Sequence, residues 1–331
     1  MTRIHQASQL SPPDTTDGVL VLIRGALGDV LLTLPFLSAL PAHFGVSGLT
    51  LVGNAGNLSL LSNQPFVRSI HNQDRAGWAG LYETPPRLPP DLLAIVRSHR
   101  VGLVQARNPQ DPTVSGLKRL GLETVLVIPS RPPADRMIHL TDYIFSVSGV
   151  TPRPGWTLIK PTAAGLAEAR AFLDARQLAD KPWLVIHPGS GSAKKNWPLE
   201  NWLALAESIQ REWKIFPLLL LGPAETGREV MIARSGLDIP VARGLSLTTL
   251  AGLLSLAVGY AGHDSGVTHL AAGLGRPTVA VFGPTNPALW APRGPLVRIL
   301  APRKAEMAAS PWDWLSVTDI RSALMDLTEE Y

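Results

Sequence analysis

The chain has 331 residues, of which 45% are hydrophobic and 17% are charged, which is enough apolar material for two domain cores and too little charge for a long disordered polyampholyte. It contains no cysteine, which excludes disulfides, a thiolate zinc site and a cysteine nucleophile. The net charge of +4 lies entirely in residues 1–160, because residues 161–331 hold equal numbers of basic and acidic side chains. This surplus is either a chance excess or the mark of an anionic partner.

Residues 1–17 are polar and lack the apolar stretch of a signal peptide, so we expect a flexible leader. No uninterrupted apolar run is long enough for a transmembrane helix, and we expect a cytoplasmic protein. Basic residues do not interleave with aromatic residues, which argues against a nucleic-acid partner.

From residue 18 onward, short apolar strands alternate with helical segments, a pattern typical of parallel βαβ units. In the first half, the expected strands are 18–24, 49–53, 67–71, 101–106 and 124–128, and the expected helices are 30–44, 91–98 and 136–148.

A proline-rich segment at 151–161 is the best candidate for a linker, and a second alternating series follows it. The expected strands there are 183–187, 216–222, 259–262 and 278–283, and the expected helices are 166–176, 199–213, 225–235, 247–256 and 267–274. Ser316 and Asp319 have capping-box spacing before a terminal helix that ends near Leu327. The sequence therefore predicts two Rossmann-like, doubly wound α/β domains, 1–160 and 161–331, that face a central cleft.

The first candidate site follows the first strand, where Arg24 and Gly25 precede Gly28 and Asp29. Ligands of open α/β sheets bind beyond the carboxyl ends of strands, and glycines allow close approach of a ligand. The Gly-x-x-Gly spacing differs from the dinucleotide fingerprint and disfavours NAD. Asp29 is either an ordinary helix-start carboxylate or a general base, and the helix N-terminus is expected to lower its pKa.

The second candidate site is the loop 187–198, which joins a strand to a helix. Its glycines and the hydroxyls of Ser190 and Ser192 suit a phosphate, and Lys194 and Lys195 add positive charge. The alternative is a plain turn with solvated lysines.

The third candidate site is the turn 262–272, in which a strand ends and a helix begins. Backbone amides from Ser265 and Gly266 onward could face an anion, whereas Asp264 could simply cap the helix. His269, one turn into the helix, is either packed or a ligand contact. Glu225, at another helix start, either complements the helix dipole or accepts hydrogen bonds from a ribose or base.

The sequence has no Asp-x-Asp, Walker A, zinc-protease or nucleophile-elbow motif. No carboxylate pair is thus expected to hold a metal, and a diphosphate would have to be stabilised by helix dipoles, hydroxyls and Lys195.

Together these blocks resemble glycosyltransferase family 9, the ADP-heptose:lipopolysaccharide heptosyltransferases. The resemblance rests on the segments 28–35, 187–198, 264–272 and 275–285, which match the family in order and spacing from about Val19 to Leu327. It implies a GT-B fold and an inverting, metal-independent single displacement. The implied donor is a nucleotide diphosphate sugar, most commonly ADP-heptose, and the implied acceptor is an anionic lipid A–core precursor.

The resemblance also implies roles for individual residues. Asp29 would be the base, and the 1–160 domain would hold the acceptor at the loop of Gly25 and Gly28. The 161–331 domain would hold the donor, and the terminal helix would pack back toward the interdomain region. The implied donor contacts are Ser190, Ser192, Lys195, Glu225, Asp264, Ser265, Gly266 and His269, and the candidate acceptor contacts are Arg24, Arg68, Arg107, Arg136, Lys118 and Arg119.

Gly25 and Ala26 stand where the family usually has a small polar pair, which removes two hydroxyls from the phosphate surroundings. The segment between Pro35 and Lys160 carries no recognisable signature, so the acceptor is not defined. Three alternatives stay open: another nucleotide sugar, a nucleotide-sugar epimerase, and a non-catalytic nucleotide-sugar-binding relative. A lipid-linked acceptor would call for at most peripheral contact with the cytoplasmic face of the inner membrane.

Overall fold

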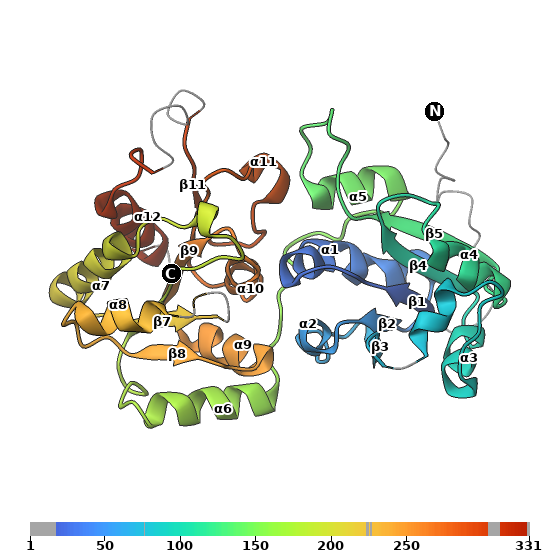
Figure 1. Cartoon of the computed structure of the whole chain (residues 1–331), viewed down its shortest axis with the longest axis horizontal. Helices are drawn as coiled ribbons and strands as arrows, with labels where there is room; N and C mark the ends of the chain where they lie inside the picture. The colour runs from blue at the N-terminus through green and yellow to red at the C-terminus, as the bar shows by residue number, and fades with distance from the viewer. Residues whose placement is uncertain (1–17, 76, 223–224, 226, 304–311, 330–331) are drawn as a thin grey trace. The chain divides into compact units, whose positions relative to one another are not determined.

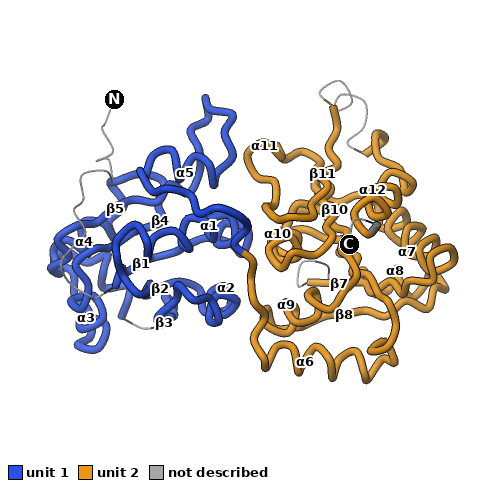
Figure 2. Tube along the Cα trace, turned by 180° about the vertical axis from the view of Figure 1, so that it is seen from behind, with its two compact units in different colours: residues 1–157 blue, residues 158–331 orange. Residues whose placement is uncertain are grey.

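The structure is a computed structural model that describes residues 18–75, 77–222, 225, 227–303 and 312–329 (Figure 1). The predicted leader at 1–17 lies outside the described residues. The chain divides into two compact units, residues 1–157 and 158–331 (Figure 2), where the sequence suggested a boundary at 160.

The first unit is built on a five-stranded parallel sheet in the order β3-β2-β1-β4-β5. Its strands are β1 (Val19–Leu22), β2 (Leu49–Gly53), β3 (Val67–Asn72), β4 (Val101–Ala106) and β5 (Thr124–Pro129). Its helices are α1 (Leu27–Phe44), α2 (Ala55–Ser59), η2 (Trp78–Tyr82), α3 (Pro90–Arg97), α4 (Pro112–Arg119) and α5 (Leu140–Ser148).

Helices cover both faces of this sheet because successive strand residues point to opposite sides. Leu20 and Val104 belong to a core cluster with residues of η2, α3 and α4. Leu103 and Ile128 instead line an apolar cavity together with residues of α1 and α5. Strands β1, β2 and β4 are buried along their whole length and are mainly apolar, whereas the edge strand β3 is polar and partly exposed.

Helix α1 is long and apolar enough to cross a membrane by length and composition alone, with a mean hydropathy of 1.4. In the structure 61% of the residues of this helix are buried inside the protein. Its apolar residues pack within the first unit, where Leu37 and Leu40 are fully buried. Its apolar composition is therefore that of a helix packed in the protein core.

The second unit contains a six-stranded parallel sheet in the order β11-β10-β9-β6-β7-β8. Its strands are β6 (Trp183–His187), β7 (Phe216–Leu221), β8 (Val241–Arg243), β9 (Gly259–His263), β10 (Thr278–Val281) and β11 (Val297–Leu300). Its helices are α6 (Ala163–Asp174), η3 (Ala193–Lys195), α7 (Leu199–Trp213), α8 (Arg228–Arg234), α9 (Leu247–Leu256), α10 (Gly266–Gly273), α11 (Pro287–Trp290) and α12 (Val317–Glu329).

One face of this sheet forms a core with α7, α8 and α12, to which Trp202, Ile232 and Leu324 contribute. Helices α6 and α9 approach each other closely at Gly165 and Gly252. A Cβ at either glycine would lie 2.3 Å from a backbone oxygen of the partner helix, so neither position accepts a side chain.

Several helix starts differ from the sequence prediction because local capping decides them. Helix α6 begins at Ala163, since the Thr162 hydroxyl accepts from the amide of Gly165. Helix α5 begins at Leu140 and not at 136, since His139 caps it. Helix α8 begins only at Arg228, after Gly227 at φ +91°.

The capping box at the terminal helix is confirmed: Ser316 donates its amide to Asp319 at 2.8 Å and accepts the Asp319 amide at 3.2 Å. Helix α12 packs on the sheet of the second unit beside α7, with Ile320 and Leu324 fully buried. Its predicted approach to an interdomain region stays a prediction.

Each sheet contains one point where the order of strands reverses. In the first unit this point lies between β1 and β4, and in the second it lies between β6 and β9. The loops that leave the carboxyl ends of two such strands diverge to opposite faces of the sheet, which opens a crevice for ligands. The three loops that the sequence singled out all follow one of these strands.

Candidate active site

The loop after β1 brings Gly25 against Asp29 in the first turn of α1. Asp29 Oδ2 accepts a hydrogen bond from the amide of Ala26 at 3.0 Å. Gly25 has φ +109°, and a Cβ there would lie 2.6 Å from Asp29 Oδ2. Glycine is thus required twice, for its backbone conformation and for the space beside the carboxylate.

The prediction that the helix N-terminus lowers the pKa of Asp29 is wrong. Burial raises the pKa of Asp29 above its ordinary value, and this outweighs the opposing effects of the Ala26 amide and the Arg131 charge. A raised pKa makes the carboxylate a stronger base than a solvated aspartate. Asp29 therefore both accepts the amide of the N-cap residue Ala26 and is suited to accept a proton.

Asp29 opens into a pocket of about 670 Å³ at the reversal point of the first unit. Arg24, Arg107 and Arg131 line the same pocket. Arg131 was not predicted from the sequence, although it lies two residues after the end of β5. The pocket combines two carboxylates, Asp29 and Asp111, with three guanidinium groups. Asp111 neutralises one of these groups, so the remaining charge suits an anionic ligand that carries a hydroxyl.

The three arginines differ in whether their charge is already paired with a carboxylate. Arg24 forms a part-buried ion pair with Asp111, at 3.0 Å between Nη1 and Oδ2, and its amide donates to Gln105. Arg107 and Arg131 are exposed, and no salt bridge is found for either among the described residues. Arg107 and Arg131 therefore carry most of the charge available to a ligand.

The other candidate acceptor contacts lie elsewhere in the first unit. Arg68 is on β3 and lines a separate polar pocket beside His71 and His99. Lys118 and Arg119 are in the last turn of α4, and Arg136 lies in the loop before α5, so none of these three lines the pocket of Asp29. Of the arginines proposed from sequence, the structure brings only Arg24 and Arg107 to Asp29.

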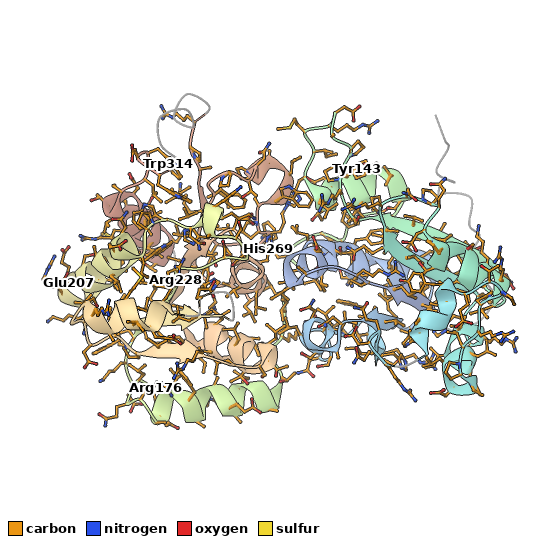
Figure 3. All side chains as sticks on the ribbon, viewed as in Figure 1. Tyr143, Arg176, Glu207, Arg228, His269 and Trp314 are labelled. Carbon is orange, nitrogen blue, oxygen red and sulfur yellow. The ribbon has the colours of Figure 1, made fainter. Side chains whose placement is uncertain are left out.

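In the second unit, the loop after β6 meets the turn after β9. Lys195 Nζ lies 2.7 Å from Asp264 Oδ2, and the hydroxyl of Thr285 donates to the same oxygen at 2.8 Å. His269 Nε2 lies 3.9 Å from the other oxygen of Asp264. His269 projects from α10 and is largely buried (Figure 3). The loop 187–198 and the turn 262–272, which the sequence predicted as separate candidate sites, therefore form one site.

Asp264 does not cap α10. Ser265 is the N-cap, and its hydroxyl accepts from the amide of Thr268. The Asp264 carboxylate is thereby left for Lys195. The Thr268 amide is used by Ser265, whereas the amides of Gly266 and Val267 precede the first hydrogen bonds of the helix and can face a ligand. A cation and a helix N-terminus lie side by side, an arrangement that favours phosphate oxygens.

The two serines of the loop after β6 have different surroundings. Ser190 is buried, and its hydroxyl lies within hydrogen-bonding distance of the Ser192 carbonyl at 2.8 Å and of Asn196 Oδ1 at 2.7 Å. Ser192 is half-buried. Ser190 thus holds the loop together, and its predicted contact with phosphates stays a prediction.

Glu225 is buried beneath the same loop. Its Oε2 accepts from the amide of Gly222 at 2.6 Å, and a Cβ at Gly189 would lie 2.1 Å from its Oε1. His187 Nε2 lies 4.0 Å away, but burial lowers the pKa of His187 to about 4, so the pair is not an ion pair near pH 7. With 4% of its surface exposed, Glu225 supports the loop, and its predicted contact with a nucleotide remains untested.

A buried polar network lies behind Ser265. The Tyr260 hydroxyl lies 3.3 Å from His187 Nδ1 and 2.9 Å from the Thr268 hydroxyl, and Ser265 Oγ lies 3.4 Å from His187 Nδ1. Gly262 leaves room for this network, because a Cβ there would lie 2.3 Å from the tyrosine oxygen. Tyr260 was not predicted as part of the site, because a tyrosine inside an apolar strand is usually a core residue.

Within the described ranges, no group of three or more His, Cys, Asp or Glu side chains is placed to hold a metal ion. Lys195 and the start of α10 supply the positive charge next to Asp264.

Comparison with solved structures identifies the architecture. The structure titled glycosyl transferase family 9 from Veillonella parvula superposes with a TM-score of 0.77 and 19% sequence identity over 97% of this chain and 100% of that one. Escherichia coli heptosyltransferase WaaC with ADP superposes with a TM-score of 0.64 and 19% identity over 93% and 99%. At this identity the likeness concerns the fold, which is the GT-B fold of a large class of glycosyltransferases.

Sequence comparison narrows the class to one family. The model of "Glycosyltransferase family 9 (heptosyltransferase)" matches residues 135–310, and the chain belongs to this family. Lipopolysaccharide heptosyltransferase 1 of Pseudomonas aeruginosa is 38% identical over 120 residues. That match spans 35% of this chain and 34% of the relative, so the chain covers about a third of the length of that curated relative.

Proposed function

We propose that this protein is an inverting, metal-independent glycosyltransferase that moves heptose from ADP-heptose to an inner-core acceptor of lipopolysaccharide. The observation that carries the proposal is the 2.7 Å pairing of Lys195 with Asp264 directly before the start of α10. Family membership and the similarity to a heptosyltransferase of Pseudomonas aeruginosa support the choice of sugar.

We assign the donor to the second unit. Phosphate oxygens would compete with Asp264 for Lys195 and accept from the first-turn amides of α10, with Ser265 and Gly266 allowing close approach. Asp264, still held by Thr285, would then accept hydrogen bonds from hydroxyls of the sugar. Loss of the nucleoside diphosphate develops negative charge on its terminal phosphate, which Lys195 and the helix start stabilise.

We assign the acceptor to the first unit, with Arg107 and Arg131 binding its anionic groups. Asp29 takes the proton of an acceptor hydroxyl, whose oxygen attacks the anomeric carbon of the sugar. The bond from that carbon to the phosphate oxygen breaks in the same step, and the nucleoside diphosphate departs with its electron pair. One displacement inverts the configuration at carbon. A lipid-linked acceptor would bring the enzyme to the cytoplasmic face of the inner membrane.

Calorimetry with ADP, GDP and UDP tests the donor assignment. We expect ADP to bind most tightly and the Lys195→Ala substitution to weaken its binding by about tenfold or more, in line with the loss of one charge-assisted contact. Lys194→Ala is the matched control, because it removes an exposed charge from the neighbouring position. Preference for another nucleotide, or equal effects of the two substitutions, would contradict this assignment.

Metal independence is tested separately. We expect transfer to continue unchanged in excess EDTA, because Lys195 and the amides of α10 supply the positive charge that the leaving group needs. A strict requirement for Mg²⁺ or Mn²⁺, restored on adding the metal back, would contradict this part of the proposal.

A further inference from the structure

His263, the last residue of β9, is completely buried and lies directly before Asp264. The backbone amide of Trp197 donates a hydrogen bond to its Nε2 at 2.7 Å. Because Nε2 is the acceptor, the ring proton of the neutral side chain sits on Nδ1. The hydrogen bond therefore fixes the tautomer of the neutral side chain.

This hydrogen bond connects the two segments that form the donor site. Trp197 follows Lys195 by two residues, and His263 directly precedes Asp264. The same two segments are joined a second time by the 2.7 Å contact between Lys195 and Asp264. The first connection is made through a backbone amide and is buried, whereas the second is made between side chains and is open to a ligand.

The histidine ring packs against two tryptophans. Trp202 meets it edge-on with centroids 5.0 Å apart, and Trp312 does so at 5.7 Å. Burial, with smaller contributions from the charges of His187 and Arg228, lowers the pKa of His263 to about 3. His263 is therefore uncharged near pH 7, and its packed ring offers a fixed acceptor that positions the Trp197 amide.

We propose that His263 is a positioning residue of the donor site, which through the Trp197 amide holds Lys195 in register with Asp264 and so sets the affinity for the phosphates of the donor. The inference rests on the proposed function, because it takes Lys195 to be the phosphate contact. It concerns a residue that touches neither nucleotide nor sugar.

The test uses substitutions that separate the acceptor atom from the packing of the ring. His263→Phe keeps an aromatic ring between the two tryptophans and removes the acceptor. His263→Gln places an amide oxygen near the position of Nε2, and His263→Asn offers the same group on a shorter side chain. Calorimetry measures the affinity of each full-length variant for ADP and for adenosine, which lacks phosphates.

We expect His263→Phe to weaken ADP binding about tenfold, which is about 1.4 kcal/mol, and to leave adenosine binding unchanged. His263→Gln should restore affinity to within about threefold, and His263→Asn should not. When Lys195 is already alanine, His263→Phe should have little further effect, because a residue that acts through Lys195 loses its influence with it.

Each contrary result points to a different failure. If Lys195→Ala leaves ADP binding unchanged, the donor assignment fails, and this inference fails with it. If Lys195→Ala weakens ADP binding, three results for His263→Phe would refute the role of His263 and leave the proposed function standing. These are unchanged ADP binding, an equal loss of adenosine binding, and a full additional loss of ADP binding in the Lys195→Ala background. Should His263→Phe not fold, equal ADP affinities of the Gln and Asn variants would refute the inference.

Discussion

Asp29 has two roles in this account, helix cap and base, and two substitutions separate them. Asp29→Asn keeps an oxygen for the Ala26 amide, now 3.0 Å from Asp29 Oδ2, and removes the basic lone pair. Because burial already favours the neutral form of this side chain, a neutral amide should not destabilise the first unit. Asp29→Ala also removes the acceptor of the Ala26 amide, at about 1 kcal/mol, which lowers Tm by about 2–4 °C.

For transfer, both substitutions remove the proton acceptor, so kcat should fall by about 10²–10⁴ in both. ADP affinity should stay within about tenfold of the unsubstituted protein, because the base acts in the transition state. Asp91→Asn is the control, since Asp91 also lies in the first turn of a helix of the first unit but outside the pocket of Asp29. Transfer at the normal rate by Asp29→Asn would reduce Asp29 to a helix cap and refute the proposed mechanism.

Three further predictions follow from the geometry. Gly25→Ala should abolish transfer, whereas Gly121→Ala should only destabilise the fold. Both glycines have φ near +110°, but only at Gly25 would a Cβ collide with the proposed base, so equal transfer rates of the two variants would contradict the prediction. Arg131→Ala should move the acidic limb of the pH–kcat profile to higher pH, since its charge lowers the pKa of the proposed base; a shift to lower pH would be wrong in sign. The free energy of unfolding, measured by chemical denaturation with tryptophan fluorescence, should fall as the pH drops below about 6.5, by up to about 1.4 kcal/mol per pH unit for each of His187 and His263. Burial lowers their pKa values in the folded protein to about 4 and about 3, so the unfolded chain takes up protons first. His263→Gln should remove about half of this pH dependence, and an unchanged slope would contradict the prediction.

Much of the architecture was predictable because parallel strands buried on both faces leave continuous apolar runs in the sequence. The strand Trp183–His187 and the helix Leu199–Trp213 were predicted to the residue. The edge strands β8 and β11 were not predicted: they have three and four residues, each contains an exposed arginine, and neither forms a continuous buried run. Helix starts also shifted where a cap outside the apolar pattern decides them, as Thr162 does for α6.

The candidate site was predictable as a set of loops but not as a set of contacts. Glycines and serines after strands mark places where a ligand can approach, and this located Asp29, Lys195 and Asp264. Which partner each side chain finds depends on residues distant in sequence, as with Lys195 and Asp264, 69 positions apart. The balance between burial and a helix N-terminus is likewise decided by packing, and for that reason the direction of the Asp29 pKa shift was wrong.

The most direct test of the central claim is an acceptor-dependent release of ADP. The protein is incubated with ADP-heptose in the presence and absence of a lipopolysaccharide inner-core acceptor that lacks heptose, and both ADP and the mass of the acceptor are measured. The account predicts that ADP appears only with the acceptor, whose mass rises by one heptose. Release of nucleotide without acceptor, or binding without any turnover, would contradict it.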